Sequence, residues 1–517
     1  MQKAEGRKKK EEFLHFVFCL LHSSDVSGHR AARVLIYTHR WLGIALGFLF
    51  IIWFVSGIVM IYARMPTLDP IERLARLPAI SPASIRVDPP AMDGEVSRFT
   101  LGTLEGRPVY KITAGGRTRL IFADTGDDVP PVDSAQALRI ARAFVGSEAV
   151  RYDARLTDAD QWTFDVRRLA PLHRIVVDDL AATRLYLTES GGDVVGKTTA
   201  SGRRWGAIGA VMHWLYFAPL RRQASLWSNA IISVSIAGTV MCAAGIAWGV
   251  WRLAPVRGYR LRDRQQWTPY SAWMRWHHYL GLVFGVTTLM WVFSGLLSMD
   301  PWSWSPSTAP TRDQRLRLAG GTIAITDLSA PRIRRAVAAF VPRMPKEIGL
   351  VRFRGRYYAS AAEGIVSLDE PQLGAAAQLP PDLVVGAAAV VMPGAPIAGM
   401  QWMEQYDAYY YDRSRRRTLP VLRVRYGDAG RTWLYFDPRH GTIARKEERL
   451  SRLNRWLYHA FHSFDFPFLY YRRPLWDIVV IVFSLGGLLL SATTLSAAVR
   501  RVRRGVKRLT ASWPGAS

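Results

Sequence analysis

Four runs along the chain contain no charged residue over lengths that can cross a lipid bilayer. Each run has 21 to 26 residues, and the four are residues 41–63, 226–251, 279–299 and 478–499. Because a helix rises about 1.5 Å per residue, these lengths match a hydrocarbon core roughly 30 Å thick. The pattern predicts a membrane protein with four transmembrane helices.

Between these runs lie two long segments in which apolar positions recur with the periods of helices and strands. Helical spacing occurs at residues 134–145 and 333–340. Alternation typical of strands occurs at residues 162–166, 184–188, 406–411 and 433–436, and a turn follows at 437–441. These patterns predict two small α+β domains. His440 in that turn and His173 after a loop proline are expected to be solvent-exposed structural residues.

Composition and charge agree with a membrane protein. Hydrophobic residues make up 49% of the chain and there are 19 tryptophans, which fits a mixture of bilayer spans and soluble parts. A net charge of +27 would suggest nucleic acid for a soluble protein. Here much of the Lys and Arg flanks the apolar runs, where membrane topology and anionic lipid explain it. We therefore expect the lipid bilayer, and no nucleic acid, as a partner.

The basic flanks also predict orientation, because short segments rich in Lys and Arg stay in the cytoplasm. They place both termini in the cytoplasm and the two long segments in the periplasm, for a multi-pass protein of the bacterial inner (cytoplasmic) membrane. The expected parts are an N-terminal tail (1–33), helix one (34–63), a first outer domain (64–205), a pre-helix with helix two (206–252), a cytoplasmic loop (253–275), helix three (276–299), a second outer domain (300–450), a pre-helix with helix four (451–499) and a C-terminal tail (500–517).

The two halves of the chain resemble each other. Residues 39–57 recur as residues 277–295, with seven of nineteen positions identical at a shift of 238. Later in each half the shift is 249, and under it His213 falls on His462. The identical positions in the first segment are His39, Leu42, Gly43, Gly47, Trp53, Ser56 and Gly57. The chain is therefore predicted to consist of two repeated, parallel halves.

Four histidines stand at matched positions beside the charge-free runs. His39 and His277 lie at the expected cytoplasmic ends of helices one and three, and His213 and His462 lie at the outer ends of helices two and four. Single histidines could anchor helix ends as Trp and Tyr do. Two matched layers favour haem, because haem iron accepts two axial imidazoles from facing helices. Glycines beside the first layer would let a porphyrin approach the helices; they are Gly43, Gly47, Gly281 and Gly285.

Neighbouring histidines leave the exact ligands open. His277 and His278 differ by about 100° around a helix, so both cannot face one iron, and the repeat favours His277. His459 and His462 share a helix face, and the repeat favours His462. No C-x-x-C-H motif occurs, so one or two haems of the b type are expected. Zinc or copper is disfavoured, because no Glu, Asp or Cys joins these layers at ligand spacing.

Three motifs carry a family resemblance: His-Arg-Trp-Leu-Gly at 39–43, Trp-Leu-Tyr-His-Ala-Phe-His at 456–462 and Arg-Pro-Leu-Trp-Asp at 473–477. Over about residues 34–500 the chain resembles the PepSY-associated transmembrane family of iron-regulated membrane proteins. The resemblance implies PepSY-like outer domains, an inner-membrane protein that carries haem on histidines and, from some members, ferrisiderophore reductase activity. It carries over His39, His213, His277 and His462 as haem ligands, with His459 as a further candidate.

The expected function is that of an oxidoreductase that passes electrons outward. Its acceptor would be a ferric siderophore or other ferric chelate, because one-electron reduction to Fe(II) weakens an oxygen-rich complex. No Gly-rich nucleotide or flavin loop occurs, so the donor would be a quinol, another reductase protein or a soluble reductant. A PepSY-domain module that binds peptides or restrains a protease, without redox activity, is the alternative. A transporter ranks below both, because the spans contain almost no internal charge.

Overall fold

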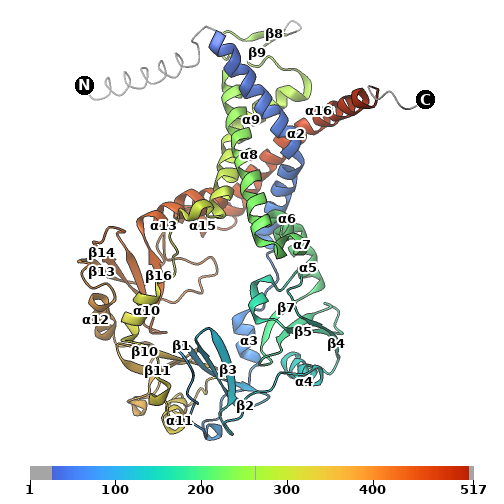
Figure 1. Ribbon diagram of the computed structural model, residues 1–517. Coiled ribbons are helices and arrows are strands. Elements are labelled where there is room, and N and C mark those ends of the chain that lie inside the picture. Colours follow the sequence, from blue (N-terminus) through green and yellow to red (C-terminus); the bar gives the residue numbers. More distant parts are fainter. Residues whose placement is uncertain (1–25, 262–263, 512–517) are drawn as a thin grey trace. The chain divides into compact units, whose positions relative to one another are not determined.

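The computed structural model describes residues 26–261 and 264–511 (Figure 1). Four helices in this part are long and apolar enough to cross a membrane: α2 (Val26–Tyr62), α8 (Ala224–Trp251), α9 (Ala272–Ser298) and α16 (Leu475–Ala511). The prediction of four membrane helices is confirmed. Most of the predicted N-terminal tail, residues 1–25, lies outside the described residues, as does the end of the C-terminal tail from residue 512.

The chain divides into two compact units, and the first contains all four membrane helices. This membrane unit comprises residues 1–63, 208–302 and 456–517. Helix α8 packs on α2 and α9, and α16 packs on the same two helices. The centre of the unit is an apolar cluster formed by Phe50, Phe54, Met241, Cys242 and Val292. Its shorter elements are η3 (Ala207–Val211), α6 (Met212–Trp214), α7 (Ala218–Arg222), β8 (Tyr259–Leu261), β9 (Arg264–Gln266), η7 (Arg455–Ala460), α14 (Phe461–Ser463) and α15 (Pro467–Tyr470).

The second unit, the loop unit, comprises residues 64–207 and 303–455. The first loop contains α3 (Pro70–Arg76), β1 (Val96–Leu104), β2 (Arg107–Ala114), β3 (Arg117–Phe122), α4 (Ser134–Val145), β4 (Val150–Leu156), β5 (Leu172–Val177), β6 (Arg184–Thr188), β7 (Val194–Thr198) and α5 (Ala200–Gly206). The second loop contains α10 (Arg312–Ala319), α11 (Ala330–Ala338), β10 (Ile348–Phe353), β11 (Arg356–Ala361), β12 (Gly364–Ser367), α12 (Pro381–Val391), β13 (Ile397–Met403), β14 (Val421–Tyr426), β15 (Trp433–Asp437), β16 (Thr442–Glu447) and α13 (Arg449–Asn454). In each loop, three strands, a helix and four strands follow in that order.

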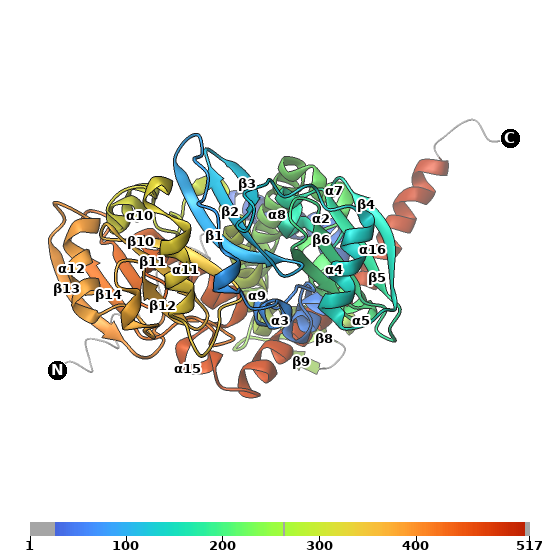
Figure 2. The same cartoon turned by 90° about the horizontal axis from the view of Figure 1, so that it is seen from below.

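The two loops share one sheet. Strands β1 and β10 pair antiparallel, with Thr100 opposite Gly349 and Leu101 opposite Ile348. They join the two three-stranded meanders into a six-stranded sheet of order β12-β11-β10-β1-β2-β3 (Figure 2). One apolar core cluster draws on both loops, and each loop adds a four-stranded sheet, β4–β7 or β13–β16. The segments predicted as two separate domains therefore form a single compact unit.

Two predicted strands are wrong, and both are the same kind of loop. Residues 162–166 lead into a 3-10 helix, and residues 406–411 form bends. In the first, Asp160 accepts hydrogen bonds from the backbone N–H of Trp162 and the hydroxyl of Tyr186. In the second, Asp407 accepts from the backbone N–H of Tyr409 and the hydroxyl of Tyr435. An aspartate that binds nearby backbone N–H groups competes with a strand ladder.

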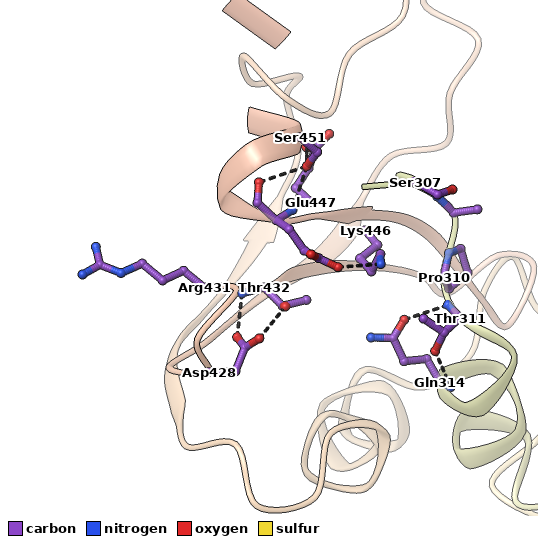
Figure 3. Close-up of polar contacts among 12 residues, drawn as sticks. Ser307, Pro310, Thr311, Gln314, Asp428, Arg431, Thr432, Lys446, Glu447 and Ser451 are labelled. Atoms are coloured by element: carbon purple, nitrogen blue, oxygen red, sulfur yellow. Dashed lines mark hydrogen bonds and ion pairs between the residues drawn. The ribbon is translucent and has the colours of Figure 1, made fainter. Parts of the chain in front are cut away.

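Other local predictions hold. Helix α4, strand β6 and strand β15 lie where apolar spacing put them. A tight turn recurs in both loops: Asp179 accepts from the backbone N–H and hydroxyl of Thr183, and Asp428 accepts likewise from Thr432 (Figure 3).

The prediction that His173 is solvent-exposed is wrong, because this residue is only 3% exposed. It lies on β5, where the hydroxyl of Tyr152 and the carbonyl of Val132 form hydrogen bonds with its two ring nitrogens. The imidazole can therefore be buried without leaving a polar atom unpaired.

Candidate functional site

His39 on α2 and His277 on α9 face each other inside the membrane unit. Their ring centroids are 5.9 Å apart, with 37° between the ring planes. His39 Nδ1 donates to the carbonyl of Met241 at 2.9 Å, and His277 Nδ1 lies 3.3 Å from the carbonyl of Leu490 and 3.1 Å from Thr493 Oγ1. Because a carbonyl only accepts, Nδ1 carries the proton in both rings. Each Nε2 then keeps a lone pair for a metal.

His213 on α6 and His462 on α14 form a second facing pair. Their ring centroids are 6.1 Å apart, with 68° between the planes. His213 Nδ1 lies 3.1 Å from Ser56 Oγ, and His462 Nδ1 lies 3.1 Å from Ser294 Oγ. Each serine hydroxyl donates its own proton to a backbone carbonyl one turn earlier, that of Trp53 for Ser56. The serine oxygen therefore accepts from the histidine, and Nε2 is again the free acceptor.

The backbone that presents the second pair has the same form in both halves. A π-helix precedes each histidine, η3 before His213 and η7 before His462. Left-handed residues follow, Leu215 at φ 51° and Phe464 at φ 48°. π-Helical turns are rare and occur frequently at functional sites. The ends of the two π-helices, the two histidines and the two left-handed residues each lie 249 residues apart.

Glycines leave room for the histidine rings. A Cβ on Gly57 would lie 3.6 Å from His213 Cε1, and a Cβ on Gly295 would lie 3.5 Å from His462 Cε1, which is ordinary contact. A Cβ on Gly245 would overlap the ring of His39. Only glycine therefore permits the observed place of His39 against α8.

Burial keeps the second pair uncharged. Desolvation, with a smaller contribution from neighbouring His462, lowers the pKa of His213 to about 4. Desolvation also lowers the pKa of His462, although its bond to the Trp291 carbonyl acts in the opposite direction. Both imidazoles are therefore neutral near pH 7, which is the form that binds a metal.

A cavity of about 620 Å³ adjoins His39 and His277. Its size is in the range of cofactor and ligand sites. Four glycines of α2 and α9 line it: Gly43, Gly47, Gly281 and Gly285. Elsewhere the lining is mostly apolar, with three arginines added. The cavity can hold a large, flat, largely apolar group in contact with two imidazoles.

Comparison with known families identifies the chain. The family model described as "PepSY-associated TM region" matches residues 36–347, which is more than half of the chain. The chain belongs to the PepSY-associated TM region family. The match includes His39, His213 and His277, whereas His462 lies beyond it. No curated protein matches the chain.

Two further candidate histidines of this PepSY-associated TM protein lie outside the pairs. Both ring nitrogens of His278 are engaged, Nδ1 with Thr268 Oγ1 and Nε2 with the carbonyl of Gly249, each at 2.7 Å. It is 6% exposed and fixes the end of α8 to the segment before α9. Unlike the paired histidines, His278 therefore has no ring nitrogen left for a metal. His459 is exposed, and its ring lies tilted against that of Tyr458, with 4.4 Å between the ring centroids.

Sequence reasoning missed the groups that orient the histidines of this family member. The carbonyls of Met241 and Leu490 are backbone atoms, so no side-chain pattern marks them. They are nevertheless 249 residues apart, the shift already found for the second part of each half. Ser56 and Ser294 were visible as repeated residues without a role. Their contacts to His213 and His462 supply one.

Proposed function

We propose that this protein is a b-type haem protein of the bacterial inner membrane that passes electrons across the bilayer to reduce ferric iron in siderophores or other ferric chelates. One observation carries the proposal. In each of the two histidine pairs, the two rings face each other with about 6 Å between their centroids, and every Nδ1 is fixed by a hydrogen-bond acceptor. Such outer bonds orient metal-binding histidines and set their tautomer.

The residues fit haem better than a metal ion alone. A metal lies about 2 Å from an imidazole nitrogen, so rings about 6 Å apart leave room for one metal between them. A closed structural zinc site needs four protein ligands. In the described part of the chain no group of three or more His, Cys, Asp or Glu side chains could hold a metal. Two imidazoles suffice when a porphyrin supplies the remaining four nitrogens.

In this proposal His39 and His277 hold the inner haem, and His213 and His462 hold a second haem near the outer surface. Haem supplies a one-electron Fe(III)/Fe(II) couple when it is bound. Ser56 follows His39 by 17 positions on α2, which is about 25 Å along the helix axis. The two pairs are thus near opposite ends of the spans, as electron transfer across the membrane requires. The matched contacts also support two repeated halves as the origin of the two sites.

The apolar cluster between the pairs would keep water out of the electron path. Phe50 lines the cavity beside His39 and contacts Trp53 and Phe54, with ring centroids 5.6 and 6.4 Å away. Phe54 in turn contacts Trp291 at 6.0 Å, and the carbonyl of Trp291 lies 3.2 Å from His462 Nδ1. Packed rings therefore connect the surroundings of one pair with those of the other.

The proposed direction of electron transfer rests on the distribution of Lys and Arg beside the membrane helices. Basic flanks favour cytoplasmic termini and a periplasmic loop unit. A quinol, a reductase or a soluble reductant would then deliver electrons on the inside, and a ferric chelate would accept one electron per iron on the outside.

The test is a dithionite-reduced minus oxidised spectrum with pyridine haemochrome on the detergent-purified full chain. We expect a low-spin b-type spectrum in the wild type, partial loss of haem in His39→Ala and in His213→Ala, and no loss in His440→Ala, a half-exposed histidine of the loop unit used as control. Protein that stays free of haem after expression with haem supplied would contradict the proposal. A PepSY-domain module that binds or regulates other proteins without redox activity would then be the better description.

A further inference from the structure

Among the residues that the structure describes, three arginines and no carboxylate line the cavity beside His39 and His277. The arginines are Arg40, Arg252 and Arg501. Within residues 26–261 and 264–511, none of the three forms an ion pair with an acidic side chain. Positive charge without a carboxylate beside an apolar cavity attracts an anion, because charges interact more strongly in a medium of low dielectric constant than in water. The cavity therefore favours an anionic group on its occupant.

Arg252 is the most constrained of the three. It caps the C-terminus of α8, and its guanidinium lies over two rings, 5.7 Å from the centroid of Trp248 and 5.6 Å from that of Tyr259. Its Nε is buried without a hydrogen-bond partner among the described residues. A buried donor left unpaired is destabilising, and more so when the group is charged. An acceptor supplied by a bound molecule would remove that cost.

A hydroxyl group stands on the same wall. Tyr270 lines the cavity, and its hydroxyl oxygen accepts a hydrogen bond from Trp248 Nε1 at 2.8 Å. The phenolic proton remains able to donate. Trp248 thus contacts both groups, the Arg252 guanidinium through its ring and Tyr270 through its N–H. A guanidinium and a hydroxyl donor on one wall match the acceptor oxygens of a carboxylate.

We propose that Arg252, assisted by Tyr270, binds a propionate carboxylate of the haem held by His39 and His277. This rests on the proposed function and deepens it, because it sets which edge of the porphyrin faces the end of α8. A phospholipid phosphate has similar chemistry. The porphyrin is favoured because one continuous cavity contacts both His277 and Arg252.

The experiment compares ferric protoporphyrin IX with its dimethyl ester, which lacks free carboxylates. Both are titrated optically into the haem-free full chain carrying His213→Ala, so that only the His39–His277 pair is intact. We expect the ester to bind roughly tenfold or more weakly than the acid. Arg252→Gln should weaken binding of the acid by a similar factor and leave the ester almost unchanged, and Arg252→Lys should restore part of the loss. Arg257→Gln, which removes an exposed charge from the same segment, is the matched control.

The outcomes are separable. Equal affinity for acid and ester would overturn the carboxylate assignment while leaving haem binding intact, and this comparison needs no substitution at Arg252. Equal weakening of both porphyrins by Arg252→Gln would mean a structural role only. Unchanged porphyrin binding with loss of tightly bound phospholipid phosphorus would assign the wall to a lipid headgroup instead. Failure of both porphyrins to bind, or binding that survives His39→Ala, would refute the proposed function itself.

Discussion

At the scale of single residues, the positions of the histidine rings depend on the small size of neighbouring glycines and on hydrogen bonds with neighbouring groups. His39 occupies the space that a side chain at position 245 would take, and His213 and His462 each bind a serine that the preceding turn has already oriented. These contacts fix the tautomer and the ring direction of each histidine, as the proposed haem binding would require. Pre-orientation of this kind reduces the entropy lost on binding.

Under the proposed function, Gly245→Ala should weaken haem binding at the His39–His277 pair. The added methyl group overlaps the imidazole, and overpacking of this kind costs about 1–3 kcal/mol, so haem affinity at this pair should fall roughly tenfold. Gly57→Ala is the matched control, because its Cβ would be in ordinary contact with His213. Haem content of the two purified variants checks this. Equal retention in both would contradict the steric argument.

Ser56→Ala should weaken the site of His213 without abolishing it. Loss of an acceptor behind a metal-binding histidine typically lowers metal affinity about 10- to 100-fold. Ser56→Thr keeps the hydroxyl and should retain most of the affinity. Ser298→Ala removes an exposed hydroxyl that only donates to the carbonyl of Gly295, and it should have no effect. Competition with a haem-binding apoprotein measures the differences.

At the scale of elements, strand pairing between β1 and β10 makes one unit of two loops. Co-expressed fragments covering residues 64–207 and 303–455 should therefore associate into a stable complex, whereas each alone exposes half of a shared core and an unpaired strand edge. Size-exclusion chromatography distinguishes the two cases. Thr100→Pro, which removes a backbone donor from β1, should prevent the association. Monomeric, well-folded single fragments would argue against it.

The turn between β15 and β16 should give the loop unit a small pH dependence. The bond to Asp437 raises the pKa of His440. Burial acts to raise the pKa of Asp437, but bonds from His440 and Thr418, with other smaller effects, together outweigh burial and lower it. A raised histidine pKa adds stability below its unfolded pKa, and that stability is lost as the pH rises through the folded pKa. Asp437 contributes above its unfolded pKa and ceases to do so on acidification.

His440→Gln should therefore destabilise the protein more at pH 5.5 than at pH 9. The effect should be modest, below about 1 kcal/mol, because the His440 side chain is half exposed. Thermal unfolding followed by tryptophan fluorescence at the two pH values tests it. Arg439→Gln changes a neighbouring charge and is the control. The same shift at both pH values would show that the ion pair is not the cause.

At the scale of the whole molecule, the proposal predicts that the two histidine pairs act in series. In proteoliposomes supplied with an internal reductant, His462→Ala should leave the inner haem reducible and slow the reduction of an external ferric chelate at least tenfold. His39→Ala should block the reduction of the inner haem and the reduction of the external chelate. If His462→Ala reduces the external chelate at the wild-type rate, electrons reach it without the second pair.

How much the sequence could predict depends on how far each signal extends along the chain. Charge-free length predicted the four helices, and the repeat predicted which histidines would lie together; their role as ligands stays a prediction. The loops at Asp160 and Asp407 were missed because their alternation resembles a strand, while the aspartate's bonds decide the backbone. The shared sheet was missed because pairing of Thr100 with Gly349 leaves no local pattern.

That pairing also constrains how the protein is made. Gly349 is synthesised 249 residues after Thr100, a delay of about 12 to 50 seconds at roughly 5–20 residues per second. During this interval one edge of β1 is unpaired, and it can pair with strands of other chains. Slow translation between the two loops should therefore increase misassembly, and a chaperone that covers β1 would protect the nascent chain until its own second loop has been synthesised.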